Sequence, residues 1–335
     1  MIKKLNIEKK SLKDKVRLSI IYRYLYILTM EQLNNHIKSN MENKETGTKK
    51  CIQKFKNILD MDLLPADLNI STMTIICRFY TKFDTENIGM YIELDPNKIV
   101  SVSYGDKTNT ETNRSLIKKK KKRDKNNSKA FYNQTTICVM SSVDNKILNA
   151  KIFKNGSIQM TGCKSIPGCI EVLDIICKEF AKIKAIIDPE TLSKIVLKPF
   201  VSNIESMSLD KINDLKICMI NSGFNIGFCI NREELYKLLS EANIECKCDL
   251  DNHACVNIKY NYKDRKKVSI FVFASGAIII TGANNCNHIL DAYEFITVTM
   301  VDNYHKIKNV GSISNGQDIR KFLESNNNDT VTAVL

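Results

Sequence analysis

The sequence predicts an α+β fold in which two similar halves share one antiparallel sheet, with helices on one face and the other face free. Three observations predict it: an internal repeat with an offset of 120 residues, a hairpin turn signal inside each copy, and a long amphipathic segment after each hairpin. The chain has 335 residues, of which 43% are hydrophobic, so it can bury the core of one large or two medium domains.

The repeat is clearest where residues 151–163 align with residues 271–283. A turn dipeptide, Asn155-Gly156 or Ser275-Gly276, lies near the middle of each copy and tolerates the positive φ of a tight hairpin. Each copy is therefore predicted to be two strands joined by a short turn. Five positions recur in both copies: Phe153/Phe273, Gly156/Gly276, Ile158/Ile278, Thr161/Thr281 and Gly162/Gly282.

The elements around the hairpins repeat in the same order. A first strand is followed by a helix start, for which Asp84 and Asn231 are good N-cap residues. A second strand then precedes the hairpin, and a helix with one apolar face follows it. In the two halves these are residues 70–77 and 217–226 for the first strand, 135–140 and 256–260 for the second, and 170–183 and 289–301 for the final helix.

The excess positive charge lies in two segments. The formal net charge is +13, and residues 1–64 and 106–129 each carry a net +7, so the remaining residues sum to 13 − 14 = −1. The second segment has loop composition and is expected to be a solvated loop, a phosphate-contacting arm or a nuclear-import signal. Its basic run is Lys118, Lys119, Lys120, Lys121, Lys122 and Arg123.

The other segments are interpreted as extensions and connections. Leu18 to Met30 is amphipathic and too short to span a bilayer, which predicts a helix, with a signal anchor as the alternative. The predicted organisation is an N-terminal basic, partly helical extension (1–64), a first repeat (65–185) with a basic loop insert (105–129), a linker (186–212), a second repeat (213–308) and a flexible tail (309–335).

The 12 cysteines are expected to be reduced thiols, because no secretory signal accompanies them. Cys246, Cys248, His253 and Cys255 form one cluster with ligand types that zinc accepts, although their spacing is tighter than that of common zinc motifs. Strand alternation alone also places Cys246 and Cys248 on one face. Both interpretations remain open, and neither a metal nor a cofactor is predicted.

The two hairpins resemble the signature IF-x-x-G-x-x-x-x-TGAK of the TATA-box-binding protein family. Ile152 to Lys164 and Val272 to Asn284 match it, and the resemblance covers about residues 66–306. It implies a saddle of two pseudo-symmetric repeats, with a curved antiparallel sheet and helices on the convex face. The Asn-, Lys- and Ile-rich composition resembles that of proteins from large DNA viruses.

The resemblance implies apolar wedges that enter the DNA minor groove. Phe153 and Phe273 occupy the signature positions, and Phe131 is the third wedge, unless a shift of one residue gives the role to Tyr132. The fourth position is occupied by His253, a departure from the family pattern and a poorer wedge. From the residues alone, Phe153 and Phe273 could instead be core, because each alternates with an aliphatic neighbour.

The resemblance also implies which residues form the floor that contacts the bases. Thr161 and Thr281 would offer hydroxyls to acceptors in the minor groove, whose pattern distinguishes mainly A·T from G·C. Several floor positions are more polar than in the family, which favours minor-groove binding in general over a preference for the TATA sequence. The implied floor also includes Thr72, Thr74, Gln159, Met219, Asn221 and Ile279.

The resemblance implies a general transcription initiation factor that binds and bends A·T-rich promoter DNA and recruits a factor IIB-like protein and RNA polymerase. The alternative is a degenerate subunit that acts through protein–protein contacts without bending DNA. An enzyme is not predicted, since the four histidines show no metal or triad spacing and no nucleotide-binding glycine motif occurs. The expected location is the nucleus or cytoplasmic viral factory of an infected cell, and the virion is a further option; no membrane association is expected.

Overall fold

The structure of this protein is a computed structural model that describes residues 47–105, 111–117, 134–187, 194–249, 254–263 and 266–309. The chain separates into two compact units, Met1–Lys49 and Lys50–Leu335. Of the first unit only the start of a helical segment, residues 47–56, is described. The amphipathic segment 18–30, the basic run 118–123, Phe131, His253 and most of the C-terminal tail lie outside the described residues.

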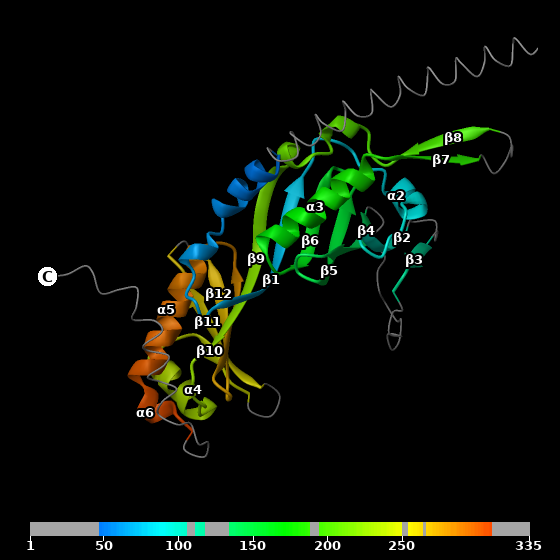
Figure 1. The fold of residues 1–335 in the computed structure, drawn as a ribbon. Helices are drawn as coiled ribbons and strands as arrows, with labels where there is room; N and C mark the ends of the chain where they lie inside the picture. Colours follow the sequence, from blue (N-terminus) through cyan, green and yellow to red (C-terminus); the bar gives the residue numbers. More distant parts are fainter. Residues whose placement is uncertain are drawn as a thin grey trace, which may run out of the picture. The chain divides into compact units, whose positions relative to one another are not determined.

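In the described residues of the second unit, eleven strands form one antiparallel sheet in the order β10-β11-β12-β13-β9-β1-β6-β5-β4-β2-β3 (Figure 1). The two halves meet where β1 pairs with β9. The strands are β1 (Asn69–Arg78), β2 (Ile99–Gly105), β3 (Glu111–Ser115), β4 (Gln134–Ser141), β5 (Lys146–Phe153), β6 (Ser157–Cys163), β9 (Asn213–Asn225), β10 (Cys246–Lys247), β11 (Cys255–Asn261), β12 (Lys267–Phe273) and β13 (Ala277–Ala283).

The helices begin at polar caps. Both predicted caps are confirmed: Asp84 accepts a hydrogen bond from Asn87 N at 2.8 Å, and Asn231 accepts from the backbone of Glu233 at 3.1 Å. The helices are α2 (Thr85–Tyr91), α3 (Ile166–Phe180), α4 (Arg232–Glu241), α5 (Cys286–Asp302) and α6 (Tyr304–Ile307), with short 3-10 helices η1 (Met61–Leu63), η2 (Ile204–Ser206) and η3 (Leu209–Lys211).

The core lies between one face of the sheet and the two long helices. In the first half α3 contacts β4 and β6, and in the second half α5 contacts β12 and β13 (Figure 1). Phe180 of α3 packs edge-on against Phe83 with ring centroids 5.6 Å apart, and Phe224 of β9 lies 4.6 Å from Tyr293 of α5. Alternate residues of each strand therefore face these helices, and the predicted α+β class with helices on one face is confirmed.

Both predicted hairpins are present, as β5-β6 and β12-β13. Their turn glycines have positive φ, +89° at Gly156 and +83° at Gly276. A Cβ atom at Gly156 would lie 2.3 Å from the carbonyl oxygen of Phe79, and one at Gly276 would lie 2.3 Å from that of Phe228. Glycine is needed at both turns for its conformation and for this close approach of another backbone segment.

The prediction that residues 105–129 are all loop is wrong for part of the segment. Residues 111–115 form β3, which pairs with β2. Arg114 donates hydrogen bonds from its guanidinium to the carbonyl oxygens of Gly89 at 2.9 Å and Ile92 at 2.8 Å, at the end of α2. These carbonyls have no partner within the helix, so the cation stabilises both the helix end and the new strand.

The segment predicted as a linker, 186–212, also has secondary structure of its own. It contributes to a separate antiparallel ribbon of β7 (Ile183–Ile187) and β8 (Ile195–Pro199), followed by η2 and η3. The helix predicted to extend to residue 183 ends at Phe180, because β7 begins three residues later. The sequence pattern Ile-Lys-Ala-Ile-Ile is compatible with either periodicity, and its pairing with β8 makes it a strand.

Candidate nucleic-acid interface

The face of the sheet opposite α3 and α5, called the open face below, carries every predicted floor and wedge residue that the structure describes. Cross-strand register places these residues together: Thr161 lies opposite Thr74, and Thr281 lies opposite Asn221. All are half-buried or exposed, and buried residues such as Met73, Met160 and Ile280 alternate with them along the strands. The ten residues are Thr72, Thr74, Phe153, Gln159, Thr161, Met219, Asn221, Phe273, Ile279 and Thr281.

The centre of the open face follows the symmetry of the repeat. Thr72 of β1 lies opposite Asn221 of β9, and Thr74 lies opposite Met219. Equivalent positions of the two halves therefore pair reciprocally across the β1-β9 junction. Thr281 of β13 donates its hydroxyl hydrogen to the side-chain oxygen of Asn221. This bond leaves the amide nitrogen of Asn221 as a donor for a ligand.

Phe153 and Phe273 lie on the open face, at the last positions of β5 and β12. Phe153 pairs with Gln134 of β4, and Phe273 pairs with Cys255 of β11. Their neighbours Ile152 and Val272 have no exposed surface and fill the core. The two phenyl rings are therefore available to a ligand, one in each half of the sheet.

The floor differs between the halves at one equivalent pair of positions. Gln159 of β6 lies between Ile76 of β1 and Lys151 of β5. Ile279 of β13, 38% exposed, lies between Gly223 of β9 and Phe271 of β12. The first half therefore has an amide and a cation where the second half has two apolar side chains.

The central strands of the sheet carry more cations than acidic residues. In the eight central strands β1, β4, β5, β6, β9, β11, β12 and β13, Asp214 is the only acidic residue among those described. Lys259 donates to Ser269 at 2.7 Å, and Lys267 lies 3.3 Å from Glu245. The cations that alternation places on the open face are Arg78, Lys151, Lys216, Lys259 and Lys267, so the open face is more cationic than the sum of −1 for these parts of the chain indicates.

Comparison with known proteins gives the family. No family model matches the chain. A curated protein named "TATA-box-binding protein-like", from Acanthamoeba polyphaga mimivirus, is 35% identical over 299 residues, which are 82% of this chain and 75% of the relative. This chain belongs to the TATA-box-binding protein-like family. The solved structure of Methanococcus jannaschii TBP is 16% identical and covers 70% of this chain and 99% of its own, with a TM-score of 0.44.

The family membership confirms the resemblance read from the two hairpin signatures, and the mimivirus relative agrees with the predicted viral origin. As a TATA-box-binding protein-like transcription factor, the chain is not an enzyme. Sequence reasoning missed two open-face residues of this family member, Lys151 and Phe271, although the offset of 120 residues relates them to each other. The alignment of residues 151–163 with 271–283 pairs these two positions, but the prediction used only residues that matched the family pattern.

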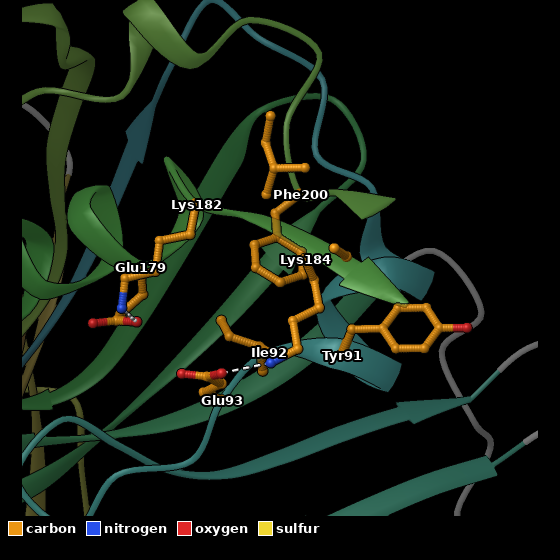
Figure 2. Close-up of a pocket in the computed structure, with 9 residues that line it drawn as sticks. Tyr91, Ile92, Glu93, Glu179, Lys182, Lys184 and Phe200 are labelled. Carbon is orange, nitrogen blue, oxygen red and sulfur yellow. Dashed lines mark hydrogen bonds and ion pairs between the residues drawn. The ribbon is translucent and has the colours of Figure 1, made fainter. Parts of the chain in front are cut away.

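A cavity of about 340 Å³ lies at the base of the β7-β8 ribbon and is the other candidate site (Figure 2). Its lining includes Tyr91, Phe200 and two lysines that are ion-paired: Lys184 Nζ lies 2.5 Å from Glu93, and Lys182 Nζ lies 2.5 Å from Glu179. Both carboxylates of the cavity are thus neutralised by neighbouring cations, an arrangement typical of structural ion pairs.

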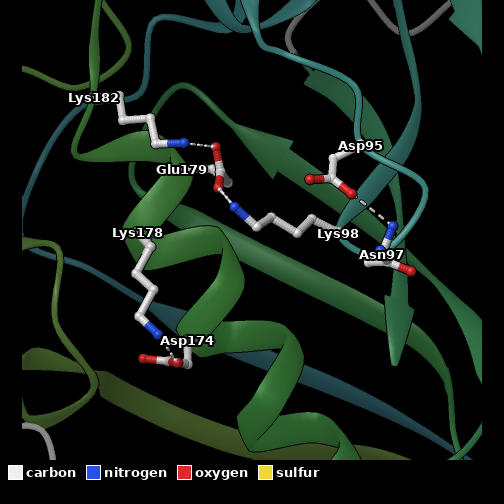
Figure 3. Close-up of polar contacts among 7 residues, drawn as sticks. All are labelled: Asp95, Asn97, Lys98, Asp174, Lys178, Glu179 and Lys182. Atoms are coloured by element: carbon white, nitrogen blue, oxygen red, sulfur yellow. Dashed lines mark hydrogen bonds and ion pairs between the residues drawn. The ribbon is translucent and has the colours of Figure 1, made fainter. Parts of the chain in front are cut away.

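Glu179 is the centre of this network (Figure 3). Its side chain is 6% exposed and accepts hydrogen bonds from Lys98 Nζ at 2.9 Å and Lys182 Nζ at 2.5 Å. Burial alone would raise the pKa of Glu179, but the two lysines outweigh it and lower the pKa. The ion pairs of Glu179 connect the end of α3 to the loop before β2, which supports a structural role for this carboxylate.

Zinc binding by the cysteine cluster stays a hypothesis. Cys246, Cys248 and Cys255 are half-buried, and His253 lies outside the described residues. Burial raises the pKa values of the Cys248 and Cys255 thiols, which disfavours the thiolate that zinc requires. Among the described residues, no group of three potential ligands could hold a metal ion, and no helix is long and apolar enough to cross a membrane.

Proposed function

We propose that this chain is a general transcription initiation factor that binds the minor groove of A·T-rich promoter DNA and bends it. The observation that carries the proposal is the open face, which collects two phenyl rings, several hydroxyls and five cations on one side of the sheet. Thr161 and Thr281 lie near its middle, and Phe153 and Phe273 lie nearer the turns. The relative named as TATA-box-binding protein-like supports the same ligand.

The mechanism assigns separate tasks to the apolar and polar groups. Phe153 and Phe273 enter base steps in the two halves and unstack them, which costs a few kcal/mol per step and is offset by the protein surface that the bent duplex contacts. Between them, Asn221 donates to an N3 or O2 acceptor of the groove. Phe131 and His253 are assigned to the equivalent opposite ends, as the family pattern implies.

Affinity is proposed to depend on cations outside the floor. Arg78 lies on β1 and Lys216 lies on β9, the two strands that join the halves. The basic run 118–123 is assigned to phosphate contact. Each neutralised phosphate releases counterions, so affinity falls steeply with salt concentration. The helices on the other face are left free for a factor IIB-like protein and RNA polymerase.

The test is a binding and bending measurement on A·T-rich and G·C-rich duplexes of equal length. The double variant Phe153→Ala/Phe273→Ala is expected to lose the bend, measured by energy transfer between dyes on the DNA ends, and to bind more weakly. Phe295→Ala is a matched control, because Phe295 is half-buried on α5 and stacks on Tyr260 away from the open face. An unchanged bend in the double variant would overturn the wedge mechanism.

The second candidate function is assembly with proteins without DNA bending, and the β7-β8 ribbon favours it. One ribbon face consists wholly of apolar residues, of which Ile187, Ile195 and Leu197 are 65%, 73% and 62% exposed. Deleting residues 118–129 separates the two functions and leaves β3 intact. If all DNA binding disappears while the protein stays folded, specific minor-groove recognition is wrong and the second function is favoured.

A further inference from the structure

We propose that Gln159 makes the first half of the open face accept a G·C base pair, so that the DNA site of this chain is asymmetric, with G·C allowed under the first half and A·T required under the second. The inference rests on the proposed function, because it names the base pairs that the same surface takes. It depends on one pair of equivalent positions, Gln159 and Ile279.

The geometry puts the two side chains in equivalent places. Gln159 is two residues before Thr161 on β6, and Ile279 is two residues before Thr281 on β13. Both side chains lie on the open face, where Ile279 is 38% exposed and Gln159 is half-buried. Any duplex that contacts Thr161 and Thr281 therefore also passes over both of them.

The base edges in the minor groove interact differently with an amide and with the branched alkyl side chain of isoleucine. An A·T pair shows only acceptors there, whereas a G·C pair adds the N2 amino donor of guanine. The side-chain oxygen of Gln159 can accept from that amino group while its nitrogen donates to a neighbouring acceptor. Against Ile279 the amino group would lose its water without gaining a partner, which is unfavourable.

The neighbours of the two positions differ in the same sense. Lys151 stands across from Gln159, and Phe271 stands across from Ile279. Among the described residues the Gln159 amide has no hydrogen-bond partner, so its donors and acceptor are not already used within the protein. The first half is thus a polar subsite and the second half an apolar one.

The experiment uses a palindromic A·T duplex, on which the chain can bind in two equivalent orientations. One G·C pair is moved through one half of the site, and then a second is added at the symmetric position. At one or more positions, a single G·C pair is expected to cost no more than about twofold in affinity, because half of the orientations are lost. The symmetric pair forces one guanine under Ile279 and is expected to cost about tenfold, or about 1.4 kcal/mol.

Inosine and two variants identify the group responsible. Inosine lacks the N2 amino group, so replacing both guanines is expected to restore the affinity to within about twofold. With Gln159→Ile, a single G·C pair is expected to lower the affinity as much as two G·C pairs do. With Ile279→Gln, two symmetric G·C pairs are expected to be tolerated. Gln53→Ile, on the exposed side of the helical segment 47–56, is the matched control and is expected to behave as the native protein.

Equal effects of one and two G·C pairs at every position, or a Gln159→Ile variant with the native pattern, would overturn this inference. Either result can occur with the A·T preference and the DNA bend intact, in which case the proposed function stands. Absence of any preference for A·T over G·C duplexes, together with absence of a bend, would overturn the proposed function as well.

Discussion

Thr281 on β13 donates its hydroxyl hydrogen to the side-chain oxygen of Asn221 on β9, at the centre of the open face. This bond holds the asparagine amide with its nitrogen free to donate. In the first half the equivalent positions are Thr74 and Thr161, which face each other across β1 and β6. No hydrogen bond joins these two residues, both of which the structure describes, so of the two equivalent pairs only Asn221 with Thr281 is held in place before binding.

Asn221→Ala is therefore expected to weaken binding to an A·T-rich duplex by about tenfold, the effect of one lost hydrogen bond to a base edge. Thr74→Ala is the matched change in the other half and is expected to cost less than about threefold, because its hydroxyl is not pre-positioned. Fluorescence anisotropy at one fixed salt concentration measures both. Equal losses in the two variants would contradict the asymmetry.

The turn glycines make a stability prediction. Gly156→Ala combines a strained positive φ with a Cβ that approaches two carbonyl oxygens, those of Phe79 at 2.3 Å and Thr81 at 2.4 Å. We expect a loss of about 1–3 kcal/mol or more in the free energy of unfolding. Gly162→Ala is the control, because its φ is also positive, at +87°, but nothing lies within 4 Å of the added atom. Urea unfolding should show the smaller loss for Gly162→Ala.

The lowered pKa of Glu179 implies that the protein loses stability as the pH falls. Its folded-state pKa is lowered because its hydrogen bonds from Lys182 and Lys98 outweigh the opposing effect of burial, which is the larger single cause. A carboxyl with a lowered folded pKa contributes stability above its unfolded value, about 4.5, and loses it as the pH falls through the folded value. Glu179→Gln is expected to lower stability at pH 7 by about 1–3 kcal/mol.

As the pH falls below 5, the melting temperature of Glu179→Gln is expected to fall less steeply than that of the native protein. The variant has no carboxyl group at position 179 to protonate. Asp174→Gln is a control on α3, since Asp174 pairs with Lys178 at 2.6 Å as an i,i+4 pair at the surface (Figure 3). A Glu179→Gln profile parallel to the native one would mean that the network does not contribute to the pH dependence.

Substitutions at the tip and at the base of the β7-β8 ribbon are expected to differ in their effect on the free energy of unfolding. Ile195→Lys is expected to change the free energy of unfolding by no more than about 0.5 kcal/mol, because the side chain is 73% exposed. Phe200→Ala, where the ribbon returns to the core with 3% exposure, is expected to cost about 3–5 kcal/mol. Thermal unfolding of the two variants measures both. A large loss for Ile195→Lys would mean that the exposed face packs against another part of the protein.

The local sequence determined the elements of the repeat and their order. The hairpins at Gly156 and Gly276 and the helix caps at Asp84 and Asn231 could be predicted because each depends on a few adjacent residues. The family resemblance also depends on short runs of adjacent residues, the two hairpin signatures. The wedge candidates and the floor positions followed from it, but their faces did not, because strand alternation leaves two choices for every strand.

Only the tertiary structure decided which face each residue takes. Ile152 and Val272 are buried against the helices, which leaves Phe153 and Phe273 on the open face. Pairing between distant strands also made β3 and the β7-β8 ribbon out of segments that read as loop and linker. The net charge of +13 by itself gave no location. The sheet placed five cations on the open face, because residues that alternate along strands are sorted onto opposite faces when the strands pair.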